Sequence, residues 1–202
     1  SLPDGAGAAT PGEKILDRPF PATPGHTFRE AITELAAKTG ENLIFRRFVR
    51  FEATDGFVAA YLHPPGKIGV LVQFAAQGGA QAASQPGIAG IAADVAMHVA
   101  ASSPRYLDEK AVDPAVLEQE KEIAANKARN EGKPEKILPK IVEGMIKKFY
   151  QDVCLVDQPF VREPAKTVAQ AIAEACKAAG QAIQVKSFVR YRFGRFAHER
   201  LI

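Results

Sequence analysis

Cysteine and histidine, the residues that most often build metal sites, are scarce in this chain. It has only two cysteines and four histidines among 202 residues. Cys154 and Cys176 have neither a metal-binding spacing nor the pattern of a disulfide framework, which fits a reducing compartment. The histidines form no H-x-x-x-H pair. We therefore expect no metal site, and we interpret both cysteines as core residues.

A strong charge bias and long apolar segments are also missing. The net charge is only +3, which does not by itself call for bulk nucleic-acid binding. No segment approaches the roughly 20 apolar residues that span a membrane, and no charged-then-apolar signal peptide is found. No glycine-rich phosphate loop and no nucleophile with a neighbouring base can be identified. We predict a folded, soluble protein that is not an enzyme and has no catalytic residue and no cofactor.

The feature that organises the chain is an internal duplication. Residues 17–50 return as residues 157–190 without a gap, at a fixed offset of 140 residues. Each copy has a capping box, apolar residues at helical spacing, a glycine where a helix can end in the left-handed conformation, and a strand pattern. The capping boxes are Thr27-x-x-Glu30 and Thr167-x-x-Gln170, and the glycines are Gly40 and Gly180. One helix–glycine–strand unit is therefore predicted twice.

The strands of the first half are predicted from their alternation. In residues 43–51 an apolar face alternates with a face that carries arginines and Phe48. The β-rich runs 57–63 and 68–74 flank a Pro/Gly turn at 64–67 and are typical of a hairpin. We expect the three segments to form a three-stranded antiparallel meander.

Three further segments have helical periodicity. Residues 88–101 are apolar enough to lie on the sheet. Pro114 opens a charged helix, as proline does in a first turn, and a second amphipathic helix runs over residues 135–152. Two such helices joined by a short Gly/Pro turn form an antiparallel hairpin. The apolar stripe of the second helix requires a partner, from this chain or from another.

Together these patterns predict an α+β fold: a three-stranded antiparallel sheet with packed helices, a protruding antiparallel helical hairpin and a repeated helix–strand unit at the C-terminus. The last strand is expected to return to the sheet region, with pairing in a partner chain's sheet as the alternative. The expected divisions are a flexible leader (1–26), a core α+β subdomain (27–112), the helical hairpin (113–152) and a C-terminal helix–strand unit (153–202) that repeats residues 17–53.

A series of short motifs runs through the chain in a fixed order. They are Lys38-Thr39-Gly40-Glu41-Asn42, Tyr61-Leu62-His63, Ile68-Gly69-Val70-Leu71-Val72, Ala96-Met97-His98-Val99-Ala100, Ser103-Pro104-Arg105-Tyr106, Asn130-Glu131-Gly132-Lys133-Pro134, Ile141-Val142-Glu143-Gly144, Lys147-Lys148-Phe149 and Gln158-Pro159-Phe160-Val161. This series resembles the elongation factor Ts family, the guanine-nucleotide exchange factors of elongation factor Tu in bacteria and organelles. The resemblance covers about residues 27–192, and its order is far more specific than any single motif.

The resemblance implies a translation factor that binds elongation factor Tu and promotes GDP release. Its implied location is the bacterial cytoplasm or, alternatively, the mitochondrial matrix or the chloroplast stroma. Thr39 and Gly40 match the family's helix-end residues that touch the nucleotide domain of the partner, although a larger aliphatic residue is common where Thr39 stands. His63 matches the hairpin tip that faces the partner's third domain. The helical hairpin is implied to dock on a partner or to form a homodimer.

Two features of the family are not matched. Residues 1–26 do not resemble the family's small three-helix domain. The Thr-Asp-Phe-Val wedge, whose phenylalanine disturbs the magnesium and phosphate site of the partner, also lacks an equivalent. Thr54-Asp55-Gly56-Phe57-Val58 has an extra glycine and precedes the hairpin, and Gln73-Phe74 stands where short members would carry the wedge. The chain therefore resembles the second half of the core with its hairpin and C-terminal unit, and release from a longer precursor is left open.

Three functions remain from these observations. The first is nucleotide exchange on elongation factor Tu, and the second is a binding-only relative or fragment that docks on elongation factor Tu or on a ribosome-associated assembly. The third is RNA binding through the basic and aromatic strand 45–51. RNA binding is disfavoured because the repeated strand follows a helix ending in glycine and because Phe45 lies on the apolar face.

Ordinary structural roles compete with the assigned site residues. Gly40 is explained by the positive φ that a helix end requires, whatever binds there. His63 fits an ordinary turn residue as well as a partner contact. His98 stands on an apolar helix face, where a hydrogen-bonded packing role is expected.

Overall fold

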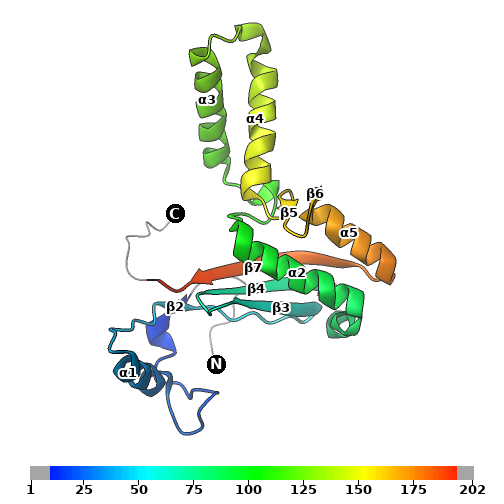
Figure 1. The fold of residues 1–202 in the computed structure, drawn as a ribbon. Coiled ribbons are helices and arrows are strands. Elements are labelled where there is room, and N and C mark those ends of the chain that lie inside the picture. The colour runs from blue at the N-terminus through cyan, green and yellow to red at the C-terminus, as the bar shows by residue number, and fades with distance from the viewer. Residues whose placement is uncertain (1–9, 195–202) are drawn as a thin grey trace. The chain divides into compact units, whose positions relative to one another are not determined.

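The computed structural model describes residues 10–194 and divides the chain into two compact units, Ser1–Glu52 and Ala53–Ile202. The larger unit is built on a three-stranded antiparallel sheet (Figure 1). Its strands are β3 (Gly56–His63), β4 (Ile68–Ala76) and β7 (Ile183–Arg192), in the order β3-β4-β7. The predicted α+β class with a three-stranded antiparallel sheet is confirmed.

The core of the larger unit lies between this sheet and helix α2 (Pro86–Ser102), which packs against β3 and β4. Alternate residues of β4, namely Val70, Val72 and Phe74, are at most 3% exposed. This period of two is what a strand with one buried face requires. The facing side of α2 contributes Ile88, Val95 and Val99, among other residues, to the same cluster. Each large apolar side chain removed from water contributes about 1.5–3 kcal/mol, so the sheet and α2 hold each other in place.

The predicted helical hairpin is formed by α3 (Pro114–Asn130) and α4 (Leu138–Val153), which pack along each other. Pro114 stands in the first turn of α3, and the Asp113 carboxylate accepts a hydrogen bond from the Ala115 N–H at 2.8 Å. The short 3₁₀ turn η4 (Glu135–Ile137) leads into α4. Figure 1 shows the two helices standing away from the sheet, joined to it at the start of α3 and the end of α4.

The C-terminal copy of the repeated unit is formed as predicted. Two short strands, β5 (Pro159–Phe160) and β6 (Glu163–Thr167), precede helix α5 (Val168–Ala179). The Thr167 hydroxyl accepts a hydrogen bond from the Gln170 N–H at 3.2 Å, and the Gln170 side chain accepts one from the Thr167 N–H at 2.9 Å. Gly180 then ends the helix with φ +63°, a conformation that only glycine adopts freely.

Strand β7 follows and pairs antiparallel with β4, from Ile68↔Arg192 to Ala76↔Ile183. The last strand therefore returns to the sheet of its own chain rather than to that of a partner. The register shifts by one residue between Gln73 and Phe74. Gln73 and Ser187 are directly paired just before this shift, and the Ser187 hydroxyl donates a hydrogen bond to the Gln73 side-chain oxygen at 3.0 Å.

The smaller unit contains the first copy of the repeat, with the same helix ends. Helix α1 (Phe28–Thr39) begins at Thr27, whose hydroxyl accepts a hydrogen bond from the Glu30 N–H at 3.2 Å. The Glu30 carboxylate accepts one from the Thr27 N–H at 2.7 Å, which completes the predicted capping box. Gly40 ends the helix with φ +67°.

The predicted strand over residues 43–51 is wrong beyond two residues. Only β2 (Arg47–Phe48) forms, paired with β1 (Thr10–Pro11), so the meander prediction is wrong in its third strand. Alternation defines the two faces of a strand but not the strand that will pair with it. Strand β4 has two edges, one occupied by β3 and the other by β7, which is the second copy of the repeat.

The burial of the smaller unit also differs from the expectation. Phe48, expected on the arginine face, is the buried residue of β2, and α1 buries none of its residues. Residues 1–9 of the expected leader lie outside the described residues. Within residues 10–26 the 3₁₀ turn η1 (Gly12–Lys14) is tied down, because the Gly12 N–H donates to the Arg46 carbonyl at 2.8 Å.

Candidate functional site

Thr39 and Gly40 form the exposed C-terminal end of α1. The Thr39 hydroxyl donates a hydrogen bond to the Leu35 carbonyl at 3.0 Å, and the Gly40 N–H donates to the Ala36 carbonyl at 2.9 Å. These bonds satisfy carbonyls that the end of a helix leaves without partners. Both residues are exposed, so the backbone at this end of α1 is accessible and held in one conformation by these hydrogen bonds.

Two apolar side chains of the smaller unit are exposed in the same stretch of sequence. Leu35, in the last turns of α1, is 52% exposed, and Ile44, four residues after Gly40, is 57% exposed. Exposed large aliphatic side chains beside a rigid helix end are suited to protein contacts.

His63 is the last residue of β3 and is also exposed. Its Nδ1 lies 3.0 Å from the Tyr61 hydroxyl, and the two rings are 6.0 Å apart. Tyr61 and His63 are two residues apart in one strand and therefore lie on the same face of the sheet. The His63 carbonyl accepts a hydrogen bond from the Gly66 N–H at 2.6 Å, which closes the turn. The imidazole is thus held at the end of the sheet by one neighbour.

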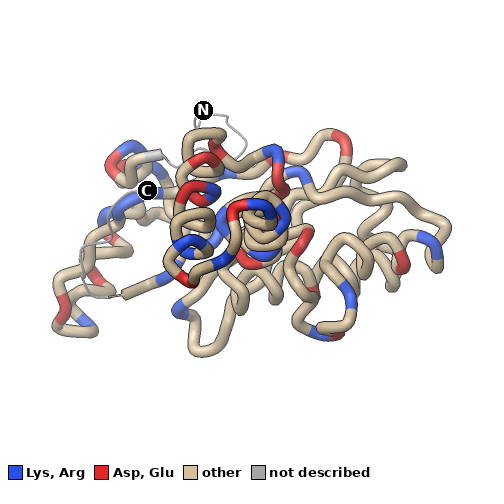
Figure 2. Tube along the Cα trace, turned by 90° about the horizontal axis from the view of Figure 1, so that it is seen from above, with Lys and Arg blue, Asp and Glu red and all other residues tan. Residues whose placement is uncertain are grey.

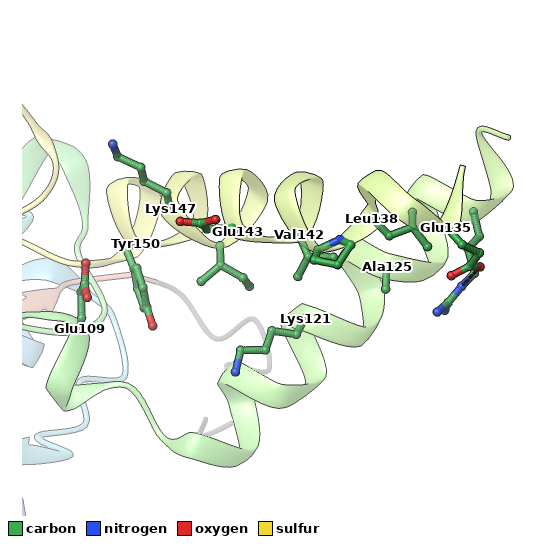
Figure 3. Close-up of a pocket in the computed structure, with 12 residues that line it drawn as sticks. Glu109, Lys121, Ala125, Glu135, Leu138, Val142, Glu143, Lys147 and Tyr150 are labelled. Atoms are coloured by element: carbon green, nitrogen blue, oxygen red, sulfur yellow. Dashed lines mark hydrogen bonds and ion pairs between the residues drawn. The ribbon is translucent and has the colours of Figure 1, made fainter. Parts of the chain in front are cut away.

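The helical hairpin carries a groove of about 730 Å³ between its two helices (Figure 3). Ala125, Leu138, Val142 and Ile146 supply apolar lining. In Figure 3, Val142 and Tyr150 point from α4 toward the side where Lys121 of α3 lies. Acidic and basic residues line the groove as well; they are Glu109, Lys121, Arg129, Glu135, Glu143 and Lys147. The apolar part of the lining can receive an apolar segment.

Charges of both signs are interspersed along the chain, as Figure 2 shows. Two ion pairs belong to the helical hairpin: Lys121 with Glu118 at 2.7 Å and Arg129 with Glu135 at 3.1 Å. Both are exposed pairs of a kind that contributes little to stability. Over residues 114–153 the sequence has eight Lys or Arg and seven Asp or Glu residues, so the helical hairpin is close to neutral.

His98 connects α2 to the base of the helical hairpin and is fully buried. Its Nε2 lies 2.9 Å from the Gln158 side-chain oxygen, and its Nδ1 accepts a hydrogen bond from the Val161 N–H at 3.1 Å. The Gln158 side-chain amide in turn donates to the Asp152 carbonyl at 2.8 Å. Burial lowers the pKa of His98, which favours the neutral ring with its proton on Nε2. The predicted packing role of His98 is confirmed.

Among the described residues, neither cysteine thiol is hydrogen-bonded to another side chain. Cys154 is fully buried, and burial raises the pKa of its thiol to about 12, which favours the protonated thiol over the thiolate. Cys176 is half-buried, and its sulfur accepts a hydrogen bond from the Ile183 N–H at 3.4 Å. Across residues 10–194, no group of three or more His, Cys, Asp or Glu side chains is placed to hold a metal ion. Over the same residues, no helix combines the length and apolarity needed to cross a membrane.

The three residues predicted as partner contacts fall in different units. Thr39 and Gly40 belong to Ser1–Glu52, whereas His63 belongs to Ala53–Ile202. All three are exposed, and each is fixed by a hydrogen bond in its own unit. The groove of the helical hairpin was not predicted in detail; its signal in the sequence was the unpartnered apolar stripe of residues 135–152.

Comparison with known proteins gives one consistent result. A family model described as elongation factor TS matches residues 9–195. The elongation factor Ts of Clostridium botulinum (strain Alaska E43 / Type E3) is 42% identical over 187 residues, which cover 93% of this chain and 59% of that relative. That of Clostridium perfringens (strain 13 / Type A) is 45% identical over 168 residues, 83% of this chain and 54% of the relative. That of Trichlorobacter lovleyi is 42% identical over 182 residues, which cover 90% of this chain and 58% of the relative. The chain thus spans little more than half the length of these relatives.

Proposed function

Because this chain belongs to the elongation factor Ts family, we propose that it binds elongation factor Tu and promotes the release of GDP from it. The family assignment makes the chain a translation elongation factor and confirms the resemblance inferred from its sequence motifs. The observation that carries the proposal is the family match over residues 9–195, which includes all the described residues. The exposed, hydrogen-bonded helix end at Gly40 and the exposed His63 are consistent with it.

The proposed activity needs no bond chemistry in this chain. A protein that binds the nucleotide-free form of its partner more tightly than the GDP form must weaken GDP binding by the same factor. A 100-fold preference corresponds to a coupling free energy of about 2.7 kcal/mol. This energy has to come from contacts made only with the nucleotide-free form. We assign such contacts to Thr39, Gly40 and His63.

A binding-only function is the second candidate, and two buried phenylalanines favour it. Phe74 stands where short family members would carry their exchange wedge, but it is 1% exposed. Phe57, in the Thr-Asp-Gly-Phe-Val sequence, is 8% exposed, and the two rings stack with centroids 5.2 Å apart. Neither ring can enter a partner without leaving the core of the larger unit. If exchange occurs, it must therefore use other contacts.

RNA binding through residues 45–51 is less well supported by the structure. The Phe45 ring is half-buried and stacks on Phe28 with centroids 6.2 Å apart. Phe48 is buried as well. A strand that recognises RNA must offer its aromatic rings to bases, and these two rings are already engaged in the protein.

The location and the assembly of the chain are further parts of the proposal. We place the protein in the bacterial cytoplasm, with an organelle matrix or stroma as the alternative, because the matched relatives are bacterial proteins. The groove of the helical hairpin is the surface through which a homodimer would form. Sedimentation of the free chain at several concentrations tests the homodimer.

The dissociation rate of a fluorescent GDP from elongation factor Tu, with and without this chain, tests the proposed exchange. A direct binding measurement is made alongside it. Faster release with binding supports exchange without the usual wedge, and binding with an unchanged release rate supports the binding-only function. Absence of binding would refute both.

A further inference from the structure

The two most exposed large apolar side chains of the described residues lie at the same end of the sheet. Leu62, next to the end of β3, is 67% exposed, and Phe193, just after β7, is 61% exposed. The Phe193 N–H donates a hydrogen bond to the Lys67 carbonyl at 2.7 Å, which continues the β4–β7 ladder past its last pair. An exposed Leu and an exposed Phe are thus held by rigid strands rather than by a loop.

At this end of the sheet, the strand register leaves a gap between apolar side chains on one of the two faces. Leu62 pairs with Gly69 of β4, and Gly69 pairs with Tyr191 of β7. Directly paired residues share a face, so Leu62 and Tyr191 flank a position without a side chain. The two flanking strands are about 10 Å apart, twice the spacing between neighbouring strands. We call Leu62, Gly69, Tyr191 and Phe193 the sheet-end notch.

Gly69 leaves the sheet-end notch open, although the backbone conformation at this position does not require a glycine. It is not among the glycines with positive φ, so another residue can adopt its conformation. A Cβ atom built at Gly69 would meet no heavy atom within 4 Å. Neither strain nor close packing explains a glycine in the middle of a sheet, where glycine weakens the strand. Free space above Gly69 is what the approach of another molecule requires.

The charge of the sheet indicates the chemistry of that molecule. The strands β3, β4 and β7 and the turn between β3 and β4 contain no Asp or Glu. They contain Lys67, Lys186, Arg190 and Arg192. Within the described part of the chain, the side chains of Lys67 and Arg192 have no ion-pair partner. Lys67, two residues before Gly69, lies on the same face as the sheet-end notch, where it would attract carboxylates, whereas Arg192 pairs with Ile68 and lies on the opposite face.

We propose that the sheet-end notch receives an apolar side chain of a protein partner that is flanked by acidic residues, with Lys67 facing those carboxylates. The proposal rests on the proposed function, since the partner tested is elongation factor Tu. It extends the contact expected at His63 to the opposite face of the sheet, because Leu62 and His63 are neighbours in one strand and alternate between its faces.

A protein partner fits these residues better than an RNA strand does. A gap above a glycine accepts one protruding side chain, whereas stacking of bases needs broad exposed rings. Tyr191 is half-buried, which leaves Phe193 as the exposed ring of the notch. Leu62 offers no stacking surface at all. An apolar centre bordered by charges is the usual composition of a protein–protein contact.

The sharpest test fills the notch and leaves the surrounding side chains unchanged. Gly69→Ala adds one methyl group in open space, so the fold is expected to be retained. We expect it to weaken the binding of elongation factor Tu by about 10-fold, the effect of a central contact. Gly90→Ala is the matched control. Gly90 is exposed on α2, lacks positive φ, and a Cβ there also meets nothing within 4 Å.

A second pair of variants removes apolar contact area instead. Leu62→Ala is expected to weaken binding by about 10-fold, whereas Val161→Ala, at a position after β5 that is 41% exposed, should leave it unchanged. Lys67→Glu should weaken binding most at low salt and reduce the dependence of affinity on salt. Lys186→Glu, an exposed change in β7 beyond the notch, is its control.

The outcomes separate this proposal from the proposed function. Loss of affinity in Gly69→Ala and Leu62→Ala but not in Gly90→Ala and Val161→Ala supports the sheet-end notch. If the unaltered chain binds elongation factor Tu and both notch variants bind as tightly, the notch proposal fails and the proposed function stands. If the unaltered chain does not bind, the proposed function fails and the notch proposal fails with it. Salt-dependent binding of single-stranded RNA that Phe193→Ala abolishes, with unchanged protein binding, would assign the notch to RNA and also overturn the proposal.

Discussion

Acidification from about pH 7.5 to about pH 5.5 should destabilise the larger unit through His98. In the folded chain Nδ1 of this fully buried ring accepts the Val161 N–H, and Nε2 faces the Gln158 side-chain oxygen. A second proton would turn Nδ1 into a donor facing another donor. Protonation of Nδ1 removes a hydrogen bond worth about 1 kcal/mol and leaves the Val161 N–H without this acceptor, at a further cost of about 1–3 kcal/mol.

The sign of the effect follows from the direction of the pKa shift. Burial lowers the pKa of His98 from its ordinary value of 6.5 in the folded chain, so the unfolded chain binds the proton more readily. Stability is therefore fully present above that ordinary value and decreases as the pH falls below it. The decrease is at most about 1.4 kcal/mol per pH unit, and at most about 1.4 kcal/mol over the interval from pH 7.5 to pH 5.5. A unit of this size would lose about 3–6 °C in melting temperature.

Urea unfolding followed by circular dichroism measures this effect. The unaltered chain and the His98→Gln variant are compared at both pH values, because glutamine keeps a hydrogen-bonding side chain but does not titrate. We expect His98→Gln to be less stable at the higher pH and to lose less stability on acidification. His63→Gln, at an exposed histidine, should behave like the unaltered chain. The same pH dependence in the His98→Gln variant and in the unaltered chain would refute the reasoning.

Three further changes have expected outcomes. Gly40→Val forces a β-branched residue into the left-handed conformation seen at φ +67°, which costs about 1–2 kcal/mol. The variant should have less helix in α1 and bind the partner more weakly. Unchanged affinity with an intact fold would count against the Gly40 contact. Thr167→Ala removes the acceptor of the Gln170 N–H and should lower the free energy of unfolding by about 1 kcal/mol, measured in urea; a loss below about 0.3 kcal/mol would contradict the capping role. In the Cys176→Ser variant the remaining thiol is that of Cys154, whose pKa is raised to about 12 by burial. Roughly one in 10,000 molecules therefore carries a thiolate near pH 8. A chromogenic disulfide reagent should react only after denaturant is added, and fast reaction in the native chain would refute the burial argument.

The helix ends were predictable because their signals are local. A threonine with an acidic or amide residue three positions later fixes the start of α1 and of α5, and a glycine with positive φ fixes each end. The packing role of His98 was predictable for a similar reason, since its neighbours on one helix face are apolar. Its partners Gln158 and Val161 lie about 60 residues away. No local pattern can name partners at such a separation.

The choice between the two repeated strands was not predictable from alternation. Residues 43–51 and β7 have similar patterns, yet only β7 pairs with β4. Pairing depends on which backbone edge is free, and that is a property of the assembled sheet rather than of a single strand. The contact residues Thr39, Gly40 and His63 came from the family resemblance. Their hydrogen bonds are now known, and their contact with a partner stays a prediction.

The strand order β3-β4-β7 has a consequence for how the chain acquires its structure. Ala76 and Ile183, which pair at one end of the β4–β7 ladder, are separated by roughly 100 residues, and closing a loop of that length carries an entropy cost that contacts formed early must offset. The β3–β4 hairpin and the helical hairpin contain mainly contacts between near neighbours in sequence, and such contacts form fast. Strand β4 therefore lacks its second neighbour until β7 has been synthesised, and until then one of its edges is open to strands of other molecules. Late closure of this edge makes the last strand the expected rate-limiting addition in folding, and the stage before it the one most exposed to aggregation.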